Sequence, residues 1–311
     1  AMERKAHHNG IKPPHAKTKD HAAIARMVDV LWWRRQLRKL HAKNVEGAAI
    51  QLGYVNKARD IYVSNESLHR RTQQNRRNAE ALENTIARNE DGQEFTLAEL
   101  SAKGTANKAI RRAELMTRIA GFERIARDME HAGLFFTITC PSRMHKWRTV
   151  KGGRVMENPR YDGTTPRDAQ AYLAKVWARI RASLKRQGIG LYGFRIAEPN
   201  HDGTPHWHLL VFHELERYGA LQDTVKRYAL QDSPNENGAH LHRVDFKRID
   251  WSRGSAAGYI AKYVAKNIDG YKLDKDLFGN DAMETSARVE AWAATWGIRQ
   301  FQQVGGPPVG P

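Results

Sequence analysis

In Pro205-His206-Trp207-His208-Leu-Leu-Val-Phe212, apolar residues alternate in a way that predicts a β-strand. Successive side chains of a strand point to opposite faces of the sheet, so His206 and His208 are expected on the same face. Two imidazoles on one face of a rigid strand are suited to bind a metal ion, with a third ligand from elsewhere. A His-x-His pair alone fits surface or structural histidines equally well, so the metal site needs support from the rest of the chain.

A second strand is predicted just upstream, at Leu191-Tyr-Gly-Phe-Arg-Ile-Ala-Glu198, and the turn-rich residues 199–204 join the two strands. Glu198 is the candidate third ligand. It faces the same way as the histidines only if it lies opposite residue 204 or 206, which requires an odd number of loop residues. A slip of one residue would turn Glu198 away, and Asp202 or His201 would then be the alternative ligand.

Two histidines and a carboxylate leave coordination positions open, as a catalytic metal requires. A substrate phosphate would complete the ligand set with oxygen atoms. Because oxygen-rich sites suit hard cations, Mg²⁺ or Mn²⁺ is the expected cofactor.

A repeated Tyr-x-x-Lys pattern occurs further along, in Gly258-Tyr-Ile-Ala-Lys-Tyr-Val-Ala-Lys266. Residues four apart on a helix lie nearly above one another, so Tyr259 and Tyr263 would present their hydroxyls to the same neighbourhood. Lys262 and Lys266 would flank them. Aromatic residues at helical spacing usually pack against a core, and that alternative stays open for the tyrosines, as a surface position does for the lysines.

Three motifs of the chain resemble, in order, those of rolling-circle replication initiators: Phe135-Phe-Thr-Ile-Thr-Cys-Pro141, Glu198-Pro-Asn-His-Asp-Gly-Thr-Pro-His-Trp-His208 and Tyr259-Ile-Ala-Lys-Tyr-Val-Ala-Lys266. These initiators belong to the His-hydrophobe-His (HUH) endonuclease superfamily. The resemblance is strongest to the bacteriophage replication gene A protein family, whose members carry two tyrosines. It extends over most of the chain.

The resemblance implies an α+β fold with a central antiparallel sheet flanked by helices. Its central strands would hold the metal ligands, and the tyrosine helix would bring its hydroxyls towards the metal. It also implies an endonuclease and strand transferase that nicks and rejoins single-stranded DNA at a replication origin through a 5′-phosphotyrosine, with a host helicase as partner. A phenol has a pKa near 10, so this chemistry needs a metal and nearby positive charge; Lys262 or Lys266 could supply that charge.

Composition favours a polyanionic partner independently of these motifs. The 311 residues include 51 Lys and Arg against 34 Asp and Glu, a net charge of +17, which fits DNA but also RNA or an anionic membrane. No apolar run approaches the roughly 20 residues needed to span a bilayer. The single cysteine, Cys140, excludes a disulfide framework. We therefore expect a soluble protein of the bacterial cytoplasm, with no membrane partner.

The chain changes character along its length. We expect a flexible basic tail at 1–20, a helical region at 21–130, the HUH endonuclease domain at 131–303 and a flexible end at 304–311. Since family members continue further, we expect this end to be a point of truncation. The apolar edge of the first long helix is expected from Ile24, Val28, Leu31, Leu37 and Leu40.

Basic residues outside the motifs could bind DNA. Arg143, Lys146 and Arg148 lie in the loop or hairpin expected at 141–164, and form a candidate DNA-facing edge. Arginine pairs at 70–71, 76–77 and 111–112 could bind phosphate or could form a solvated basic face.

Two alternatives to a tyrosine endonuclease remain at this stage. One is a basic origin-DNA or RNA-binding protein without enzymatic activity, which predicts salt-sensitive binding and no cleavage. The other is a metal-dependent nuclease that uses activated water, which predicts cleavage without a covalent adduct. The absence of His-Glu-x-x-His argues against a zinc protease.

Overall fold

The computed structural model describes residues 1–14, 19–271 and 281–306. Its central feature is a five-stranded sheet in the order β8-β3-β7-β6-β9, in which every neighbouring pair is antiparallel. The strands of this sheet are β3 (Ala132–Ile138), β6 (Tyr192–Pro199), β7 (Pro205–His213), β8 (Val244–Arg248) and β9 (Phe301–Val304). The strand predicted at 205–212 is therefore confirmed, and it lies in the middle of the sheet.

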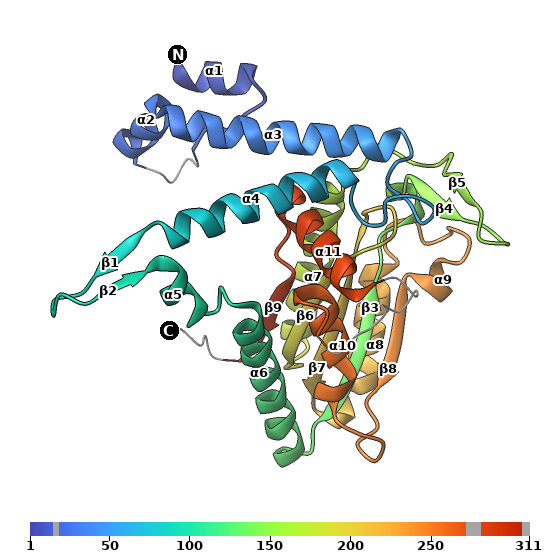
Figure 1. The fold of residues 1–311 in the computed structure, drawn as a ribbon. Helices are drawn as coiled ribbons and strands as arrows, with labels where there is room; N and C mark the ends of the chain where they lie inside the picture. Colours follow the sequence, from blue (N-terminus) through green and yellow to red (C-terminus); the bar gives the residue numbers. More distant parts are fainter. Residues whose placement is uncertain (15–18, 272–280, 307–311) are drawn as a thin grey trace.

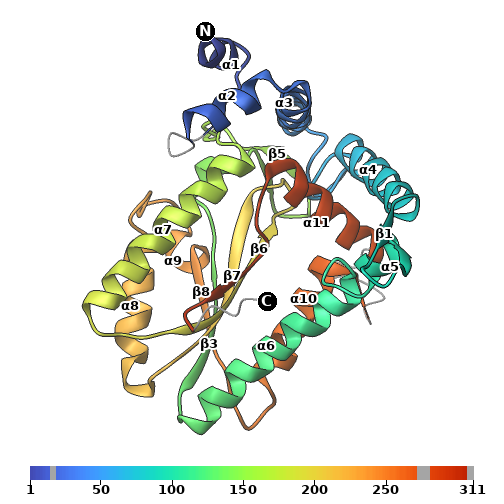
Figure 2. The same ribbon diagram turned by 90° about the vertical axis from the view of Figure 1, so that its left-hand side faces the viewer.

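Helices cover both faces of the sheet (Figures 1 and 2). On one face lie α7 (Pro166–Arg186) and α8 (Tyr218–Ala229); on the other lie α6 (Lys108–Asp128) and α10 (Ala256–Ile268). The alternation along β7 divides its residues between them, because Leu209 and Val211 join the core beneath α7 whereas Leu210 and Phe212 join the core beneath α10. This arrangement confirms the predicted α+β class with a central antiparallel sheet.

The helix α7 begins with residues that favour a helix start. The Thr165 hydroxyl accepts a hydrogen bond from the Asp168 amide, and Pro166 occupies the first turn, where its missing N–H is not needed. The buried side chains of α7 then recur at helical spacing, including Leu173, Trp177 and Ile180.

The N-terminal part of the chain packs beside this sheet domain (Figure 1). Its elements are α1 (Met2–His8), α2 (Asp20–Val28), α3 (Val30–Gln51), α4 (Asn65–Glu83), β1 (Ile86–Arg88), β2 (Glu94–Thr96) and α5 (Leu97–Ala102). Residues 1–20, expected as a flexible tail, contain α1, and Ala6 and Ile11 are buried against Met27 and Trp32. The region expected to be helical also includes the β1–β2 hairpin.

The apolar edge expected along one long first helix is not buried. The helix is interrupted at Asp29, between α2 and α3. The Asp29 carboxylate caps α3 by accepting hydrogen bonds from the Leu31 and Trp32 amides. The break leaves Ile24, Val28, Leu31 and Leu37 largely exposed. The burial in this region is instead provided by Trp32, and the Trp33 indole donates to the Met27 carbonyl at 2.8 Å.

The remaining short elements connect these parts: η1 (Ser142–Met144), β4 (Trp147–Thr149), β5 (Val155–Glu157), η2 (Leu215–Arg217) and α9 (Ala239–His242). A longer helix, α11 (Ala282–Trp296), lies between α3, α4 and the sheet domain. At the C-terminal end, β9 runs to Val304, and residues 307–311 of the expected flexible end lie outside the described residues. Among the described helices, none combines the length and apolar character needed to cross a membrane.

Candidate active site

The register of the β6–β7 hairpin decides where Glu198 points. Glu198 lies directly opposite His206, Ile196 lies opposite His208, and residues 200–204 form the loop. This loop has an odd number of residues, so the parity condition is met and Glu198 shares a face with both histidines. Because these two strands are central in the sheet, the three side chains are held on a rigid support.

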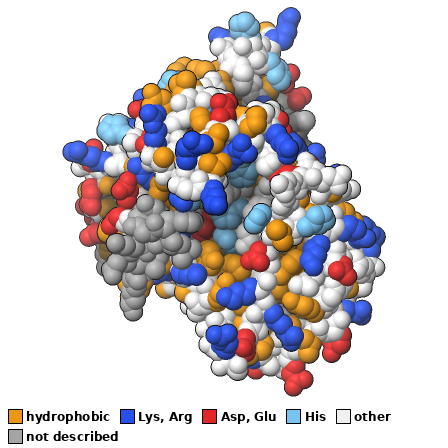
Figure 3. All heavy atoms as spheres, turned by 90° about the vertical axis from the view of Figure 1, so that its right-hand side faces the viewer, with side chains coloured by type: hydrophobic (Ala, Val, Ile, Leu, Met, Phe, Trp, Pro, Cys, Tyr) orange, Lys and Arg blue, Asp and Glu red, His pale blue; other side chains and the backbone are white. Residues whose placement is uncertain are grey.

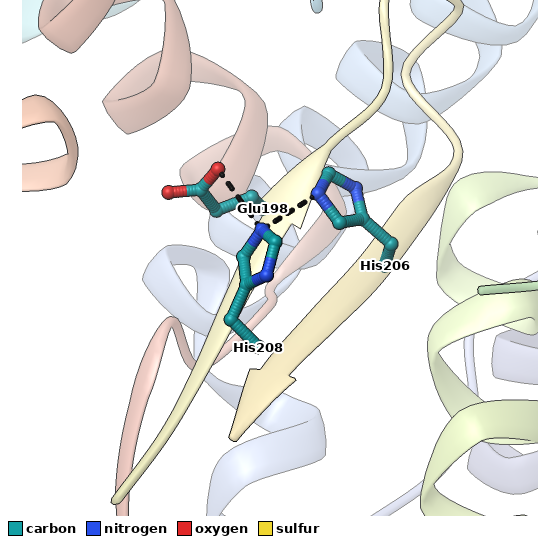
Figure 4. Close-up of side chains that lie close together, drawn as sticks. All are labelled: Glu198, His206 and His208. Carbon is teal, nitrogen blue, oxygen red and sulfur yellow. Dashed lines mark hydrogen bonds and ion pairs between the residues drawn. The ribbon is translucent and has the colours of Figure 1, made fainter. Parts of the chain in front are cut away.

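The three side chains converge (Figure 4). One ligand atom from each of Glu198, His206 and His208 lies within 4.8 Å of the others. The two Nε2 atoms are 2.9 Å apart, and His208 Nε2 is 3.6 Å from Glu198 Oε2. Adjacent ligands of an octahedral ion with bonds of about 2.1 Å lie about 3.0 Å from one another, so this donor set fits a divalent cation.

The alternative ligands are used elsewhere. The Asp202 carboxylate accepts a hydrogen bond from the Thr204 amide at 3.0 Å and lies 3.1 Å from His145 Nδ1. The His201 ring stacks on Tyr62 with the ring centroids 5.8 Å apart. Neither belongs to the three-residue cluster, so Glu198 is the carboxylate that the structure brings to the histidines.

Neighbouring groups orient Glu198 and His208 and favour the ionised form of Glu198. Burial would raise the pKa of Glu198, but the opposing charge of Lys266, whose Nζ is 3.2 Å from Oε2, and the contact with His208 hold that pKa below its usual value. Asn267 donates to the other carboxylate oxygen. Thr137 Oγ1 lies 2.9 Å from His208 Nδ1, a second contact of the kind that orients metal-bound histidines.

His206 is held in its neutral form. Burial, followed by the proximity of His208, lowers the pKa of His206 well below its ordinary value. Its Nδ1 is buried and has no hydrogen-bond partner among the described residues. A neutral imidazole offers a lone pair, which is the state that metal binding requires.

The tyrosine helix α10 lies over this cluster. The Tyr263 ring centroid is 4.6 Å from that of His208, and the Tyr259 and Tyr263 centroids are 6.4 Å apart. Both rings also pack on Phe135, so the tyrosines combine the packing expected of aromatic residues with a position beside the candidate metal ligands. Burial, then Tyr259 and Glu198, raise the pKa of the Tyr263 phenol above its ordinary value. A phenol in this position can be an effective nucleophile only if added positive charge favours its ionised form.

The two lysines of the pattern occupy different environments. Lys262 is exposed, and its Nζ lies 5.6 Å from the Tyr259 ring centroid and 5.3 Å from that of Tyr263. Lys266 is buried against Glu198, and its Nζ lies 5.4 Å from the Tyr62 ring centroid. The structure thus brings Lys262 to the phenols and Lys266 to the carboxylate of the cluster.

The cluster and Tyr263 line a cavity of about 170 Å³ that also contains a residue absent from the sequence-based site, Tyr62. Tyr62 comes from the segment between α3 and α4, adopts a left-handed backbone conformation (φ 71°), and donates its amide to the His201 carbonyl at 3.2 Å. No motif marks it, because its position depends on how the N-terminal helices dock. Asn267 was also missed, although it adjoins Lys266 in the tyrosine motif. Figure 3 shows histidine side chains in a hollow near the middle of one face, with lysine and arginine side chains above it.

The expected DNA-facing residues lie apart from this cavity. Arg143 is ion-paired with Asp162 and with Asp232, the latter at 2.7 Å, and Lys146 is paired with Glu157. Arg148, on β4, is exposed and makes no ion pair with any residue in the described ranges. Of the three, Arg148 is the one whose charge is not matched by a carboxylate.

Comparison with known proteins identifies the relatives of this chain. A family model described as "Bacteriophage replication gene A protein (GPA)" matches residues 2–271. The replication gene A proteins of Escherichia phages 186 and P2 are 43% and 38% identical, over 92% and 93% of this chain and 42% and 39% of their own lengths. A "probable replication endonuclease" from a prophage-like region of Salmonella paratyphi A is 34% identical over 92% of this chain and 36% of its own.

The chain therefore spans less than half the length of these relatives. No solved structure matches it significantly. The family match covers most of the chain, including the strands that carry Glu198, His206 and His208 and the helix that carries both tyrosines. The chain belongs to the bacteriophage replication gene A protein family.

Proposed function

We propose that this chain is the catalytic part of a rolling-circle replication initiator with an HUH endonuclease fold. In this proposal it nicks and rejoins single-stranded DNA at a replication origin, with Mg²⁺ or Mn²⁺ and through a 5′-phosphotyrosine. The observation that carries the proposal is the common location of the two kinds of group: the Tyr263 ring lies 4.6 Å from that of His208, within the cluster that can bind a metal. The names of the relatives, which include replication endonucleases, support the same reaction class.

Each residue of the site has a distinct part in this reaction. Glu198, His206 and His208 would hold the cation, and Lys266 and Asn267 keep Glu198 ionised and oriented. A bound divalent cation would withdraw charge from the phosphate oxygens and favour the phenolate. Lys262, placed over both rings, would stabilise the phenolate further.

The strand transfer balances without an added cofactor. A tyrosine oxygen forms a bond to phosphorus and the bond from phosphorus to the 3′ oxygen breaks; the phenol loses a proton and the 3′ hydroxyl gains one. The phosphotyrosine retains the energy of the phosphodiester, so the 3′ hydroxyl can later attack it and reseal the strand without ATP.

A second tyrosine within reach suits a rolling circle. While one tyrosine remains joined to the 5′ end, the regenerated origin must be cut by another nucleophile before the first strand is released. Tyr259 and Tyr263, with ring centroids 6.4 Å apart beside one cluster, can alternate in these roles. Because the phosphate must be accessible, the substrate is single-stranded or locally melted DNA, opened with the help of a host helicase in the cytoplasm.

The test is the formation of a covalent adduct. The protein is incubated with a pool of single strands of random sequence, labelled at the 3′ end because a 5′-phosphotyrosine retains that side of the cut, and with Mg²⁺ or Mn²⁺, then separated under denaturing conditions. We expect a labelled adduct that is lost in EDTA and in the double variant Tyr259→Phe/Tyr263→Phe. Tyr54→Phe is the matched control, because Tyr54 is exposed and outside the site cavity.

The alternatives give different outcomes. An adduct that persists in the double variant excludes these tyrosines as nucleophiles. Cleavage without an adduct indicates a nuclease that uses water, and salt-sensitive binding without cleavage indicates a protein that only binds nucleic acid. Activity that survives EDTA excludes the metal from the reaction.

A further inference from the structure

A basic groove lies outside the site described above, where α3, α4 and α11 meet (Figure 1). Its volume is about 640 Å³. Its charged lining comes from two helices, and we call these residues the arginine groove: Arg34, Arg38 and His41 of α3, and Arg70, Arg71 and Arg77 of α4. None of the described residues that line the groove carries a carboxylate, and the other lining residues are uncharged: Ala42 of α3, Ser67 and Gln74 of α4, and Ala294 and Thr295 of α11.

Helical spacing sets two rows of arginines against each other. Arg34 and Arg38 are four residues apart on α3, and Arg70 and Arg77 are separated by two turns of α4, so each set lies on one face of its helix. Both faces border the same groove. Like charges gathered in this way repel one another, so this arrangement is unfavourable unless an anion binds between the rows.

The positive charge of the groove is only partly neutralised by its surroundings. Arg71 pairs with Glu290 at 2.9 Å and Arg70 with Glu66 at 3.0 Å. Arg34 and Arg38 make no ion pair with any residue that the structure describes, and Arg77 reaches only the Gln74 side-chain oxygen, at 3.2 Å.

Arg70 adds a second observation. Its Nη1 is buried and has no hydrogen-bond partner in the described part of the chain. An unsatisfied buried donor on a guanidinium is rare, and it indicates an acceptor that binds from outside.

The groove also lies close to the catalytic cavity. Tyr62 lines the cavity and Ser67 lines the groove, so the two sites are joined by a short segment of chain. Residues five apart are separated by at most about 18 Å, at about 3.6 Å per residue. A stacked strand covers that distance with about 5 nucleotides, at about 3.4 Å each.

We propose that the arginine groove binds the sugar–phosphate backbone of DNA that extends from the cutting site. Guanidinium groups match phosphate oxygens in geometry and charge, and repeated arginines along two helices match a repeated anion. The lining lacks the large apolar or aromatic anchors on which protein partners usually depend. This inference rests on the proposed function, since it assigns a second contact to the same DNA.

The test compares two triple variants that lose the same charge. Arg34→Ala/Arg38→Ala/Arg77→Ala removes exposed groove residues, and Arg35→Ala/Lys39→Ala/Arg76→Ala removes exposed neighbours on the same helices that do not line the groove. Binding of fluorescent oligo(dT) of about 5 and about 20 nucleotides is measured by anisotropy at several salt concentrations. Binding of a duplex of the longer length is measured in the same way, because single-stranded and double-stranded DNA share the sugar–phosphate backbone.

We expect the groove variant to bind the longer single strand roughly tenfold more weakly than the control variant. The slope of log K against log salt concentration should also be smaller in magnitude by about 2, because each of three lost phosphate contacts on a single strand contributes about 0.7. Binding of the short strand should be equal in the two variants. Equal losses on the longer DNA would overturn the proposal. Binding of poly-glutamate that equals binding of DNA in the wild type and is lost in the groove variant would also overturn it, in favour of an acidic protein segment.

The two proposals fail separately. Oligo(dT) binding does not need Tyr259 or Tyr263. If the wild-type protein forms no adduct, the proposed reaction is therefore wrong, but the measurement of DNA binding by the groove remains valid. Conversely, a groove variant that forms the adduct and binds long DNA as the control does would remove only the groove proposal.

Discussion

At the scale of single residues, Glu198 depends on its neighbours more than any other member of the site. It is buried, so its charge is tolerated only because Lys266 and Asn267 lie against it. The sequence predicts Lys262 and Lys266 as equivalent partners of the tyrosines. The structure separates them, because α10 turns one lysine inward to the sheet and leaves the other at the surface.

This separation leads to a prediction for Lys266→Met. The variant leaves a buried carboxylate without its counter-charge, so the free energy of unfolding should fall by about 3 kcal/mol. Lys262→Met, the matched change one turn earlier, should alter it by less than about 0.5 kcal/mol. Urea denaturation measures both, and added Mn²⁺ should restore part of the loss in Lys266→Met because a cation can replace the missing charge.

Equal stability of the two variants would show that the contact between Lys266 and Glu198 is not important for folding. If Lys266→Met lowers the free energy of unfolding and added Mn²⁺ does not restore it, the charge of Lys266 is not coupled to metal binding at this cluster.

At the scale of elements, the sequence predicts the hairpin and the tyrosine helix well because their signals are local. Alternation along 205–212 fixes which side chains share a face, and the loop length fixes the parity. Local signals are weaker where a short element interrupts a pattern: α9 occupies residues 239–242, so β8 begins only at Val244. The position of Tyr62 has no local signal at all, since it depends on how distant helices dock.

The same hairpin yields a prediction for Gly193→Ala. Gly193 has φ of 150°, and a Cβ there would lie 2.0 Å from the Leu210 carbonyl oxygen of the partner strand. The strands that carry the candidate metal ligands would have to separate, so we expect the free energy of unfolding to fall by about 3 kcal/mol or more, or the protein not to fold. Gly219→Ala is the control, because it lies in α8 with open space around it and should stabilise the helix by about 0.5–1 kcal/mol.

Thermal denaturation followed by circular dichroism measures both variants. If Gly193→Ala melts at the wild-type temperature, the prediction that β6 and β7 lie too close at Gly193 to admit a Cβ is wrong.

At the scale of the whole molecule, α11 connects the N-terminal helices to the sheet domain. The Trp292 indole donates to the Gly203 carbonyl at 2.7 Å, in the loop between the ligand strands, and Arg288 donates to the Val63 carbonyl at 3.2 Å, beside Tyr62. Glu290 accepts from Lys108 at 2.6 Å and from Arg71 at 2.9 Å. These contacts join segments that are far apart in the chain, which is why the sequence alone predicts neither the cavity lined by Tyr62 nor the arginine groove.

Glu290 makes this connection sensitive to pH. Burial would raise its pKa, but Lys108, Asn75 and Arg71 lower it from the ordinary 4.5 to about 2. A group whose pKa is depressed by folding stabilises the protein above its unfolded-state pKa and loses that contribution as pH falls towards the folded-state value. The contribution of Glu290 should therefore be complete at neutral pH and decline between about pH 4.5 and about pH 2.

We expect Glu290→Gln to lower the free energy of unfolding by about 2 kcal/mol at neutral pH, after allowance for solvent screening around its partly exposed partners. The gap between wild type and variant should narrow as the pH is lowered from 5.5 towards 3.5, because the unfolded wild type takes up a proton at Glu290 while the folded protein stays ionised, and the variant has no such group. Urea denaturation across that pH range measures the gap, with Glu80→Gln as a control in an exposed pair with Arg76. A gap that stays constant with pH would contradict this prediction, because it would mean that the ionisation of Glu290 is not coupled to folding.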